Sequence, residues 1–166
     1  MSVDETLDAL LPLFYNYYNV NTDSPDEPFA AEATFNSHNE QYYLIKAAKV
    51  ADVNINEYVY FAKCDRLDMQ SLSELDRTAW ERGLAKVKPG YDHRSTDVSL
   101  FIISDTIDDQ ARKLIRKMRH YKSYKWGFNG WSNYRLVAIE CSEGKAFYNH
   151  QGRSFRKLVG NILKHS

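Results

Sequence analysis

The sequence lacks most of the features by which a function can be recognised from sequence alone. Its two cysteines, Cys64 and Cys141, lie far apart without a CxxC partner, so neither a disulfide framework nor a zinc knuckle is indicated. The five histidines show no HxxxH or HxH spacing, and the Walker pattern and the GxSxG elbow are absent. We therefore predict no metal site and no cofactor, and we favour a protein that is not an enzyme.

Targeting signals and membrane spans are missing as well. Asp4 and Glu5 stand where a signal peptide needs basic residues, and no apolar run reaches the length of a bilayer-crossing helix. We expect a cytoplasmic protein with no membrane partner. A length of 166 residues predicts one domain, in which residues 1–28 form an acidic helix and a polar loop and residues 29–166 form the core.

Charge is distributed very unevenly along the chain. The formal net charge is zero, yet residues 1–32 hold seven acids and no Lys or Arg, whereas residues 111–166 hold thirteen bases and only two acids. Aromatic residues are also abundant, at 14%, and tyrosine combines a large apolar body with a polar tip. The charge polarity has two physical explanations: the acidic end folds against the basic end, or each end faces a different partner.

Hydrophobic periodicity and turn-forming residues predict a mixed order of helices and strands. Helices are predicted over residues 3–19, 71–87, 107–119 and 152–164, and strands near 31–36, 41–50, 56–63, 98–103, 122–128, 134–141 and 145–149. Residues 19–28 read as a polar loop, residues 52–56 as a hairpin connection, and a helix over 39–51 is the alternative to the second strand. Mixed order of this kind predicts an α+β fold, with a mixed or mainly antiparallel sheet of about five to six strands packed by three to four helices.

The helix boundaries carry their own signals. Ser2 with Glu5, and Ser71 with Glu74, have the spacing of a capping box. Asp105 or Thr106 is the predicted cap of the helix over 107–119. Pro12 is the weak point of the first helix, because an interior proline removes a backbone donor and clashes with the preceding turn.

The segment 120–135 offers the strongest indication of a binding surface. It follows a basic helix, and residues 111–125 carry seven bases and no acid. Cations attract phosphates and aromatic faces stack on unpaired bases, so this mixture is typical of single-strand binding. The predicted polyanion-binding residues are Arg112, Arg116, Arg119, Lys122, Tyr124, Lys125, Trp126, Trp131 and Arg135. The alternative is a solvated basic helix followed by a strand whose core-facing positions are Tyr124, Trp126 and Phe128.

A weaker pattern resembles a metal-dependent nuclease site. Glu143 and Lys145 form an ExK pair, and Asp97 or Asp105, at the two ends of the buried strand, could supply the second carboxylate that metal-assisted cleavage needs. An exposed Glu143–Lys145 ion pair in a turn is the simpler interpretation.

Three hypotheses about function follow. The first is a non-enzymatic module that binds nucleic acid or another polyanion through its basic, aromatic C-terminal third. The second is a metal-dependent phosphodiester hydrolase that uses the ExK pair. The third is a homo-oligomeric interaction domain whose tyrosines and tryptophans form an interface.

Overall fold

Seven strands of one mixed sheet organise the protein, which we describe from a computed structural model covering residues 1–37, 54–90 and 93–164. The strand order is β1-β2-β3-β4-β6-β5, and β7 also pairs with β6. The strands are β1 (Asn19–Asn21), β2 (Ala31–Asn36), β3 (Asn54–Leu67), β4 (His93–Ile107), β5 (Tyr121–Ser123), β6 (Trp131–Glu140) and β7 (Lys145–Tyr148). The predicted α+β fold is confirmed, with seven strands in place of five to six.

The centre of the sheet is parallel and its edges are antiparallel. Strands β3, β4 and β6 run in the same direction, with Tyr60, Leu100 and Leu136 in register. Two crossover helices make this possible, α2 (Met69–Ala85) between β3 and β4, and α3 (Asp109–Lys117) between β4 and β6. The predicted strand over 98–103 is the middle of β4, whose side chains are buried on both faces as its continuous apolar run requires.

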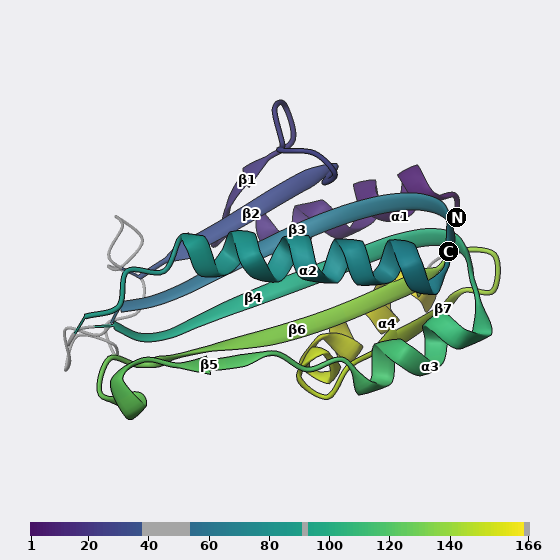
Figure 1. Cartoon of the computed structure of the whole chain (residues 1–166). Helices are drawn as coiled ribbons and strands as arrows, with labels where there is room; N and C mark the ends of the chain where they lie inside the picture. Colours follow the sequence, from purple (N-terminus) through teal and green to yellow (C-terminus); the bar gives the residue numbers. More distant parts are fainter. Residues whose placement is uncertain (38–53, 91–92, 165–166) are drawn as a thin grey trace.

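Helices cover both faces of the sheet (Figure 1). Helices α2 and α3 pack on one face, where Leu72, Ala79 and Ile115 meet Leu100 and Tyr134. Helices α1 (Val3–Leu10) and α4 (Arg156–Lys164) pack on the other face, around a separate cluster that includes Phe61, Phe101 and Val159. None of the described helices is long and apolar enough to cross a membrane.

The first helix is shorter than predicted. The Ser2–Glu5 capping box is present, with the Glu5 amide donating to the Ser2 hydroxyl at 3.1 Å and the Ser2 amide to the Glu5 carboxylate at 2.8 Å. The α-helix ends at Leu10 and continues as the 3₁₀ helix η1 (Leu11–Phe14), because Pro12 cannot donate the next helical hydrogen bond. The polar loop predicted over 19–28 begins with the short edge strand β1.

The other boundaries differ from the predictions in smaller ways. Helix α2 is capped by Asp68, whose carboxylate accepts from the Ser71 amide at 2.8 Å, so Ser71 is the third helical residue and not the cap. Helix α3 begins after Asp108, which forms no side-chain capping bond, and not after Asp105 or Thr106. The last helix begins as the 3₁₀ turn η5 (Gln151–Phe155). The strand or helix predicted within 39–51 lies outside the described residues, as do residues 52 and 53 of the predicted hairpin connection. Residues 54–56 of that connection belong instead to the start of β3.

The predicted strand over 122–128 is confirmed only at residues 122 and 123, and the rest of it is wrong. Strand β5 ends at Ser123, and the chain then forms the 3₁₀ turn η4 (Lys125–Gly127), because Lys125 and Trp126 adopt positive φ angles of 45° and 55°. An extended strand requires negative φ at every position. The alternating aromatic residues of this segment therefore belong to a folded loop. Their side chains do not share the core-facing side that a strand would give them.

Candidate functional site

The edge of the sheet at β6 is covered by two short strands with a gap between them. Strand β5 pairs with residues 131–133 of β6 and β7 pairs with residues 137–140. The buried Asn149 side chain fills the gap: its oxygen accepts from the Leu136 amide at 2.9 Å, and its nitrogen donates to the Tyr134 carbonyl at 3.2 Å and the Met118 carbonyl at 3.1 Å. This side chain completes the strand edge and fixes the segment after β7 against β6.

A basic pocket lies beside β7, with a volume of about 420 Å³. We call it the β7 pocket; its lining residues are Arg116, Lys145, Ala146, Phe147, Tyr148, Arg153 and Arg156. Four cations converge here from α3, β7, η5 and α4, of which Lys145 is paired with Glu143 at 2.6 Å. Among the described residues, no carboxylate is part of the pocket lining. Two of them lie over aromatic rings, Arg116 over Phe147 at 6.0 Å and Arg156 over Tyr148 at 5.7 Å, which holds the guanidinium groups near the pocket.

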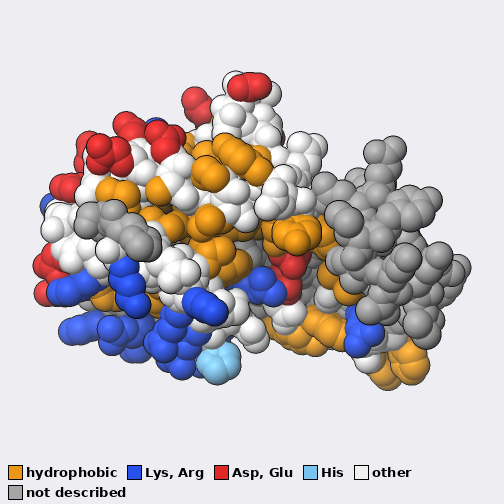
Figure 2. Space-filling model, turned by 180° about the vertical axis from the view of Figure 1, so that it is seen from behind, with side chains coloured by type: hydrophobic (Ala, Val, Ile, Leu, Met, Phe, Trp, Pro, Cys, Tyr) orange, Lys and Arg blue, Asp and Glu red, His pale blue; other side chains and the backbone are white. Residues whose placement is uncertain are grey.

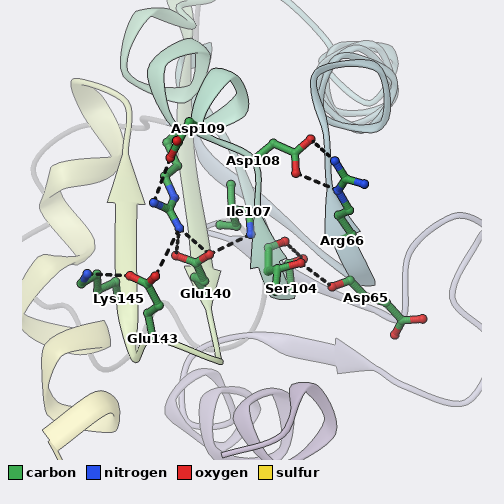
Figure 3. Close-up of polar contacts among 11 residues, drawn as sticks. Asp65, Arg66, Ser104, Ile107, Asp108, Asp109, Glu140, Glu143 and Lys145 are labelled. Atoms are coloured by element: carbon green, nitrogen blue, oxygen red, sulfur yellow. Dashed lines mark hydrogen bonds and ion pairs between the residues drawn. The ribbon is translucent and has the colours of Figure 1, made fainter.

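Ion pairs at the end of β6 neutralise one of the predicted binding residues (Figure 3). Arg112 donates to both oxygens of the buried Glu140, at 2.6 and 2.7 Å, and Glu140 also accepts from the Ile107 amide at 2.9 Å. Hydrogen bonding to Glu140 raises the pKa of Arg112. Arg112 is therefore a structural residue that fastens α3 to the sheet, while Arg116, one turn later, remains exposed in the β7 pocket.

A second, smaller pocket opens at the gap between β5 and β7, with a volume of about 190 Å³. We call it the gap pocket; its lining residues are Arg119, His120, Tyr121, Asn133, Tyr134, Asn149, His150 and Gln151. Its lining, too, holds no carboxylate from the part of the chain that the structure describes. Among the residues predicted to bind a polyanion, Arg119 lies here.

The loop after β5 forms an aromatic tip. Trp126 is 96% exposed and Phe128 is 83% exposed, so neither occupies the core position that a strand would have given it. Only Tyr124 turns inward, where its hydroxyl lies 3.0 Å from that of Ser132 and its ring meets His93 edge-on. Gly127 and Gly130 have positive φ angles of 91° and 82°, a conformation that glycine adopts without steric cost.

The lysines of the tip and the two pockets form one surface, which we call the basic edge. Lys122 lies over the Tyr124 ring at 5.4 Å, and Lys125 stands beside the exposed Trp126. Figure 2, which views the face covered by α1 and α4, shows Lys and Arg side chains gathered on one side and carboxylates on the opposite side.

Two predicted binding residues lie away from this surface. Arg135 projects to the α1 and α4 face, where it pairs with Asp97 and lies over the Phe155 ring at 5.4 Å. Trp131 is half-buried at the start of β6. The same face also holds a hydrogen bond from the Tyr18 hydroxyl to Glu57, and burial followed by the charge of Glu57 raises the Tyr18 pKa.

The four residues of the nuclease hypothesis are divided between two ends of the sheet. Asp97 is in register with Asn133, which precedes Glu140 by seven residues, or roughly 23 Å of strand. Asp105 is near the turn, since its carbonyl accepts from the Ser142 amide at 3.0 Å. Glu143 pairs with Lys145 at 2.6 Å and its pKa is lowered by that hydrogen bond. Within residues 1–37, 54–90 and 93–164, no three His, Cys, Asp or Glu side chains are grouped to hold a metal.

The sequence did not reveal two parts of the site. The first is the β7 pocket, where residues far apart in the sequence lie together: Arg116, Lys145, Arg153 and Arg156. The basic residues of the predicted helix over 152–164 indicated a basic surface but not this grouping. The second is a contact beneath the gap pocket, where His120 Nε2 lies 2.7 Å from Asp76 Oδ2 across 44 residues of chain. No local pattern indicates a pair so far apart.

Comparisons with known proteins identify a family. A family model described as a domain of unknown function (DUF8052) matches residues 3–161, which is nearly the whole chain. The chain therefore belongs to this family. No curated protein and no solved structure matches it.

Proposed function

We propose that this member of the family binds nucleic acid, as a polyanion, along its basic edge. The observation that carries the proposal is the succession of two pockets on one sheet edge, both lined by cations and neither, within residues 1–37, 54–90 and 93–164, by a carboxylate. Together they present Arg116, Arg119, Lys145, Arg153 and Arg156. Phosphate groups are bound by such clusters through charge and hydrogen bonds, largely without regard to base sequence.

The aromatic tip favours a single-stranded ligand over a duplex. Trp126 and Phe128 are exposed beside Lys122 and Lys125, so an unpaired base can stack on either ring while the lysines contact its phosphates. Stacked bases inside a duplex do not offer their faces to such rings. A single strand lying along the basic edge would contact the tip, the gap pocket and the β7 pocket in succession.

A binding isotherm measured by fluorescence anisotropy tests the proposal. We expect a labelled single-stranded oligonucleotide to bind more tightly than a duplex of the same length, with affinity falling steeply between 50 and 200 mM salt, about 0.7 units of log K per unit of log salt for each phosphate contact. The double substitution Arg116→Gln with Arg153→Gln should lower both the affinity and the salt slope.

A matched control removes the same charge from another part of the molecule. Lys63→Gln with Lys88→Gln takes away two exposed lysines that lie outside the basic edge, and we expect this variant to bind like the unsubstituted protein. Absence of binding to any oligonucleotide at low salt would overturn the proposal, as would an equal loss of affinity in the two double variants.

The other two hypotheses stay predictions. The nuclease hypothesis keeps only Asp105 near the Glu143–Lys145 pair. For a homo-oligomer, a groove of about 600 Å³ between α1 and α4 is lined mainly by apolar side chains, among them Leu13, Leu158 and Ile162.

A further inference from the structure

The gap pocket differs from the β7 pocket in size and in the kind of cation that lines it. Its volume of about 190 Å³ is below the range of drug-sized ligand sites, so it suits a small group such as one phosphate. Its lining offers Arg119, His120, His150, Tyr121 and the Gln151 amide, which can donate hydrogen bonds to an oxyanion, beside Tyr134, Asn133 and Asn149. The β7 pocket, in contrast, holds Arg and Lys alone as its cations.

One of these histidines is held in a fixed orientation. Asp76, on the buried side of α2, has 8% of its side chain exposed and binds His120 Nε2 at 2.7 Å. The imidazole is stacked on Trp80 with ring centroids 5.2 Å apart and meets the edge of Tyr134 at 4.8 Å. Its side chain is still 30% exposed and lines the gap pocket.

This contact decides what the other ring nitrogen can do. A carboxylate only accepts hydrogen bonds, so Asp76 requires Nε2 of His120 to carry a proton. In the neutral imidazole, Nδ1 is then an acceptor and presents its lone pair, which disfavours an anion. In the protonated imidazole, Nδ1 becomes a second donor and the ring carries a positive charge. The Asp76 contact thereby links the charge of the ring to its ability to bind an oxyanion.

We infer that the gap pocket is a phosphate-binding site whose affinity is controlled by protonation of His120, with Asp76 as the residue that positions the imidazole. This inference rests on the proposed function, which it sharpens by assigning one phosphate to one pocket. Binding strengthens as the pH falls through the range in which histidines titrate, between about pH 8 and 5, and weakens as it rises.

The groups that face His120 act in both directions. Asp76 from α2 favours the charged imidazole, whereas the neighbouring Arg119 disfavours it and a protonated His150 would do the same. Tyr134 from β6 faces the imidazole edge, and burial, followed by the charge of Asp76, raises the Tyr134 pKa well above its usual value. Tyr121 from β5 lines the same pocket. A bound phosphate offsets the repulsion among the cations, so binding and protonation promote each other.

Sulfate is the probe for the test, because its charge does not change between pH 5 and 8 whereas that of phosphate does. We expect calorimetric or NMR titration of the full chain to give about tenfold tighter sulfate binding at pH 6 than at pH 8, the value of one hydrogen bond to a charged group. His120→Gln should remove this difference and leave the weaker affinity at both pH values. Asp76→Asn should reduce the difference, since the amide no longer requires a proton on Nε2.

Matched variants separate this site from its surroundings. Arg119→Gln should weaken sulfate binding about equally at the two pH values, and His150→Gln should reduce the pH dependence less than His120→Gln does, since no described carboxylate is paired with His150. The inference is overturned if the pH dependence survives His120→Gln or disappears with His150→Gln. Histidine resonances of each variant show whether the fold is intact, and Arg119→Gln keeps the test decisive if a variant at His120 does not fold.

Oligonucleotides then connect the pocket to the proposed function. The gain in affinity from pH 8 to pH 6 is measured for a 5′-phosphorylated single strand and for the same strand without the terminal phosphate. A larger gain for the phosphorylated strand would mean that the pocket binds a terminal phosphate. Equal gains would mean that it binds a backbone phosphate. Oligonucleotide binding with no effect of His120→Gln would reject the pocket and leave the proposed function standing. Sulfate binding with the expected pH dependence, but without any oligonucleotide binding, would reject the proposed function and support the phosphate-binding pocket.

Discussion

The two edges of the sheet carry opposite charge although the protein as a whole is neutral. The edge formed by β1 and its loop belongs to the acidic segment 1–32, whereas the basic edge is built from residues 116–156. The strand order follows the chain almost from one edge to the other, and only β5 and β7 depart from it. A gradient of charge along the sequence thus becomes a gradient across the molecule.

The ion pairs of the acidic segment 1–32 bear on the two explanations of the charge polarity. Helix α1 packs beside α4, yet its Asp4 pairs with Lys63 of β3, at 2.7 Å. Among the described residues, no ion pair joins segment 1–32 to segment 111–166. In the described residues, the acidic end therefore does not neutralise the basic edge, which agrees with the proposal that the basic edge faces a ligand.

The largest effect we expect comes from Glu140, the buried acid at the end of β6. Glu140→Gln removes the carboxylate that holds Arg112 and the Ile107 amide, and breaking such a buried pair costs about 3 kcal/mol or more of unfolding free energy. Chemical denaturation measures this loss. The substitution should loosen α3 and, with it, the position of Arg116 in the β7 pocket.

Glu143→Gln is the control for this prediction. It removes the same charge from the same edge, but Glu143 is exposed and pairs with Lys145 at the surface, so we expect a change below about 1 kcal/mol. Equal losses of unfolding free energy in the two variants would mean that the buried contacts of Glu140 with Arg112 and the Ile107 amide add no stability, and would contradict the prediction.

The next effect concerns the turn that presents the aromatic tip. A Cβ on Gly130 would lie 2.4 Å from the Arg94 carbonyl, while one on Gly127 meets nothing within 4 Å, although both residues have positive φ. We expect Gly130→Ala to destabilise the protein by more than about 2 kcal/mol and Gly127→Ala by about 1 kcal/mol, the cost of backbone strain alone. Thermal unfolding of the two variants compares them, and similar melting temperatures would contradict the close approach at Gly130.

The contrast between predicted and observed structure is sharpest at this tip. The continuous apolar run at 98–103 predicted a central strand correctly, because burial on both faces leaves a local pattern. The alternation of Tyr124, Trp126 and Phe128 imitates a strand equally well, but the positive φ angles of Lys125 and Trp126 depend on a turn that the alternation does not encode. Periodicity shows which residues would share a face of a strand. They share it only if the backbone is extended at every position between them.

The site was predictable only in part for a related reason. The basic stretch 111–125 correctly indicated that Arg116 and Arg119 belong to one basic surface, since Arg116 is an exposed position of α3 and Arg119 follows that helix. The same stretch included Arg112, whose partner Glu140 is 28 residues away, and local composition cannot distinguish a neutralised arginine from an available one. Arg153 and Arg156 lie in the β7 pocket because of the way the last helix packs, which local composition does not indicate.

Trp126→Ala tests the aromatic tip without disturbing the fold. Because the side chain is almost fully exposed, we expect unchanged stability, together with a loss of about 1–3 kcal/mol in binding to a single strand, the value of one stacked base. Duplex affinity should change little. Tyr15→Ala, an exposed aromatic of the acidic segment, is the control and should bind like the unsubstituted protein; equal losses would show that the tip has no special role.

The smallest effect contrasts a paired acid with one at the acidic edge. Asp108 accepts two hydrogen bonds from Arg66, at 2.7 and 2.8 Å, and these bonds lower its pKa below the value of about 3.9 expected in the unfolded chain. A lowered pKa in the folded state adds stability that is present above about pH 4 and is lost as the pH falls through the folded value. Asp108→Asn should therefore flatten the decline in melting temperature between about pH 4 and 2, at the cost of a slightly lower value at neutral pH. Asp23→Asn, at an exposed acid that pairs with no other described residue, should leave the curve unchanged; a flattening of equal size there would mean that the acid sensitivity comes from total charge and not from the Arg66 contact.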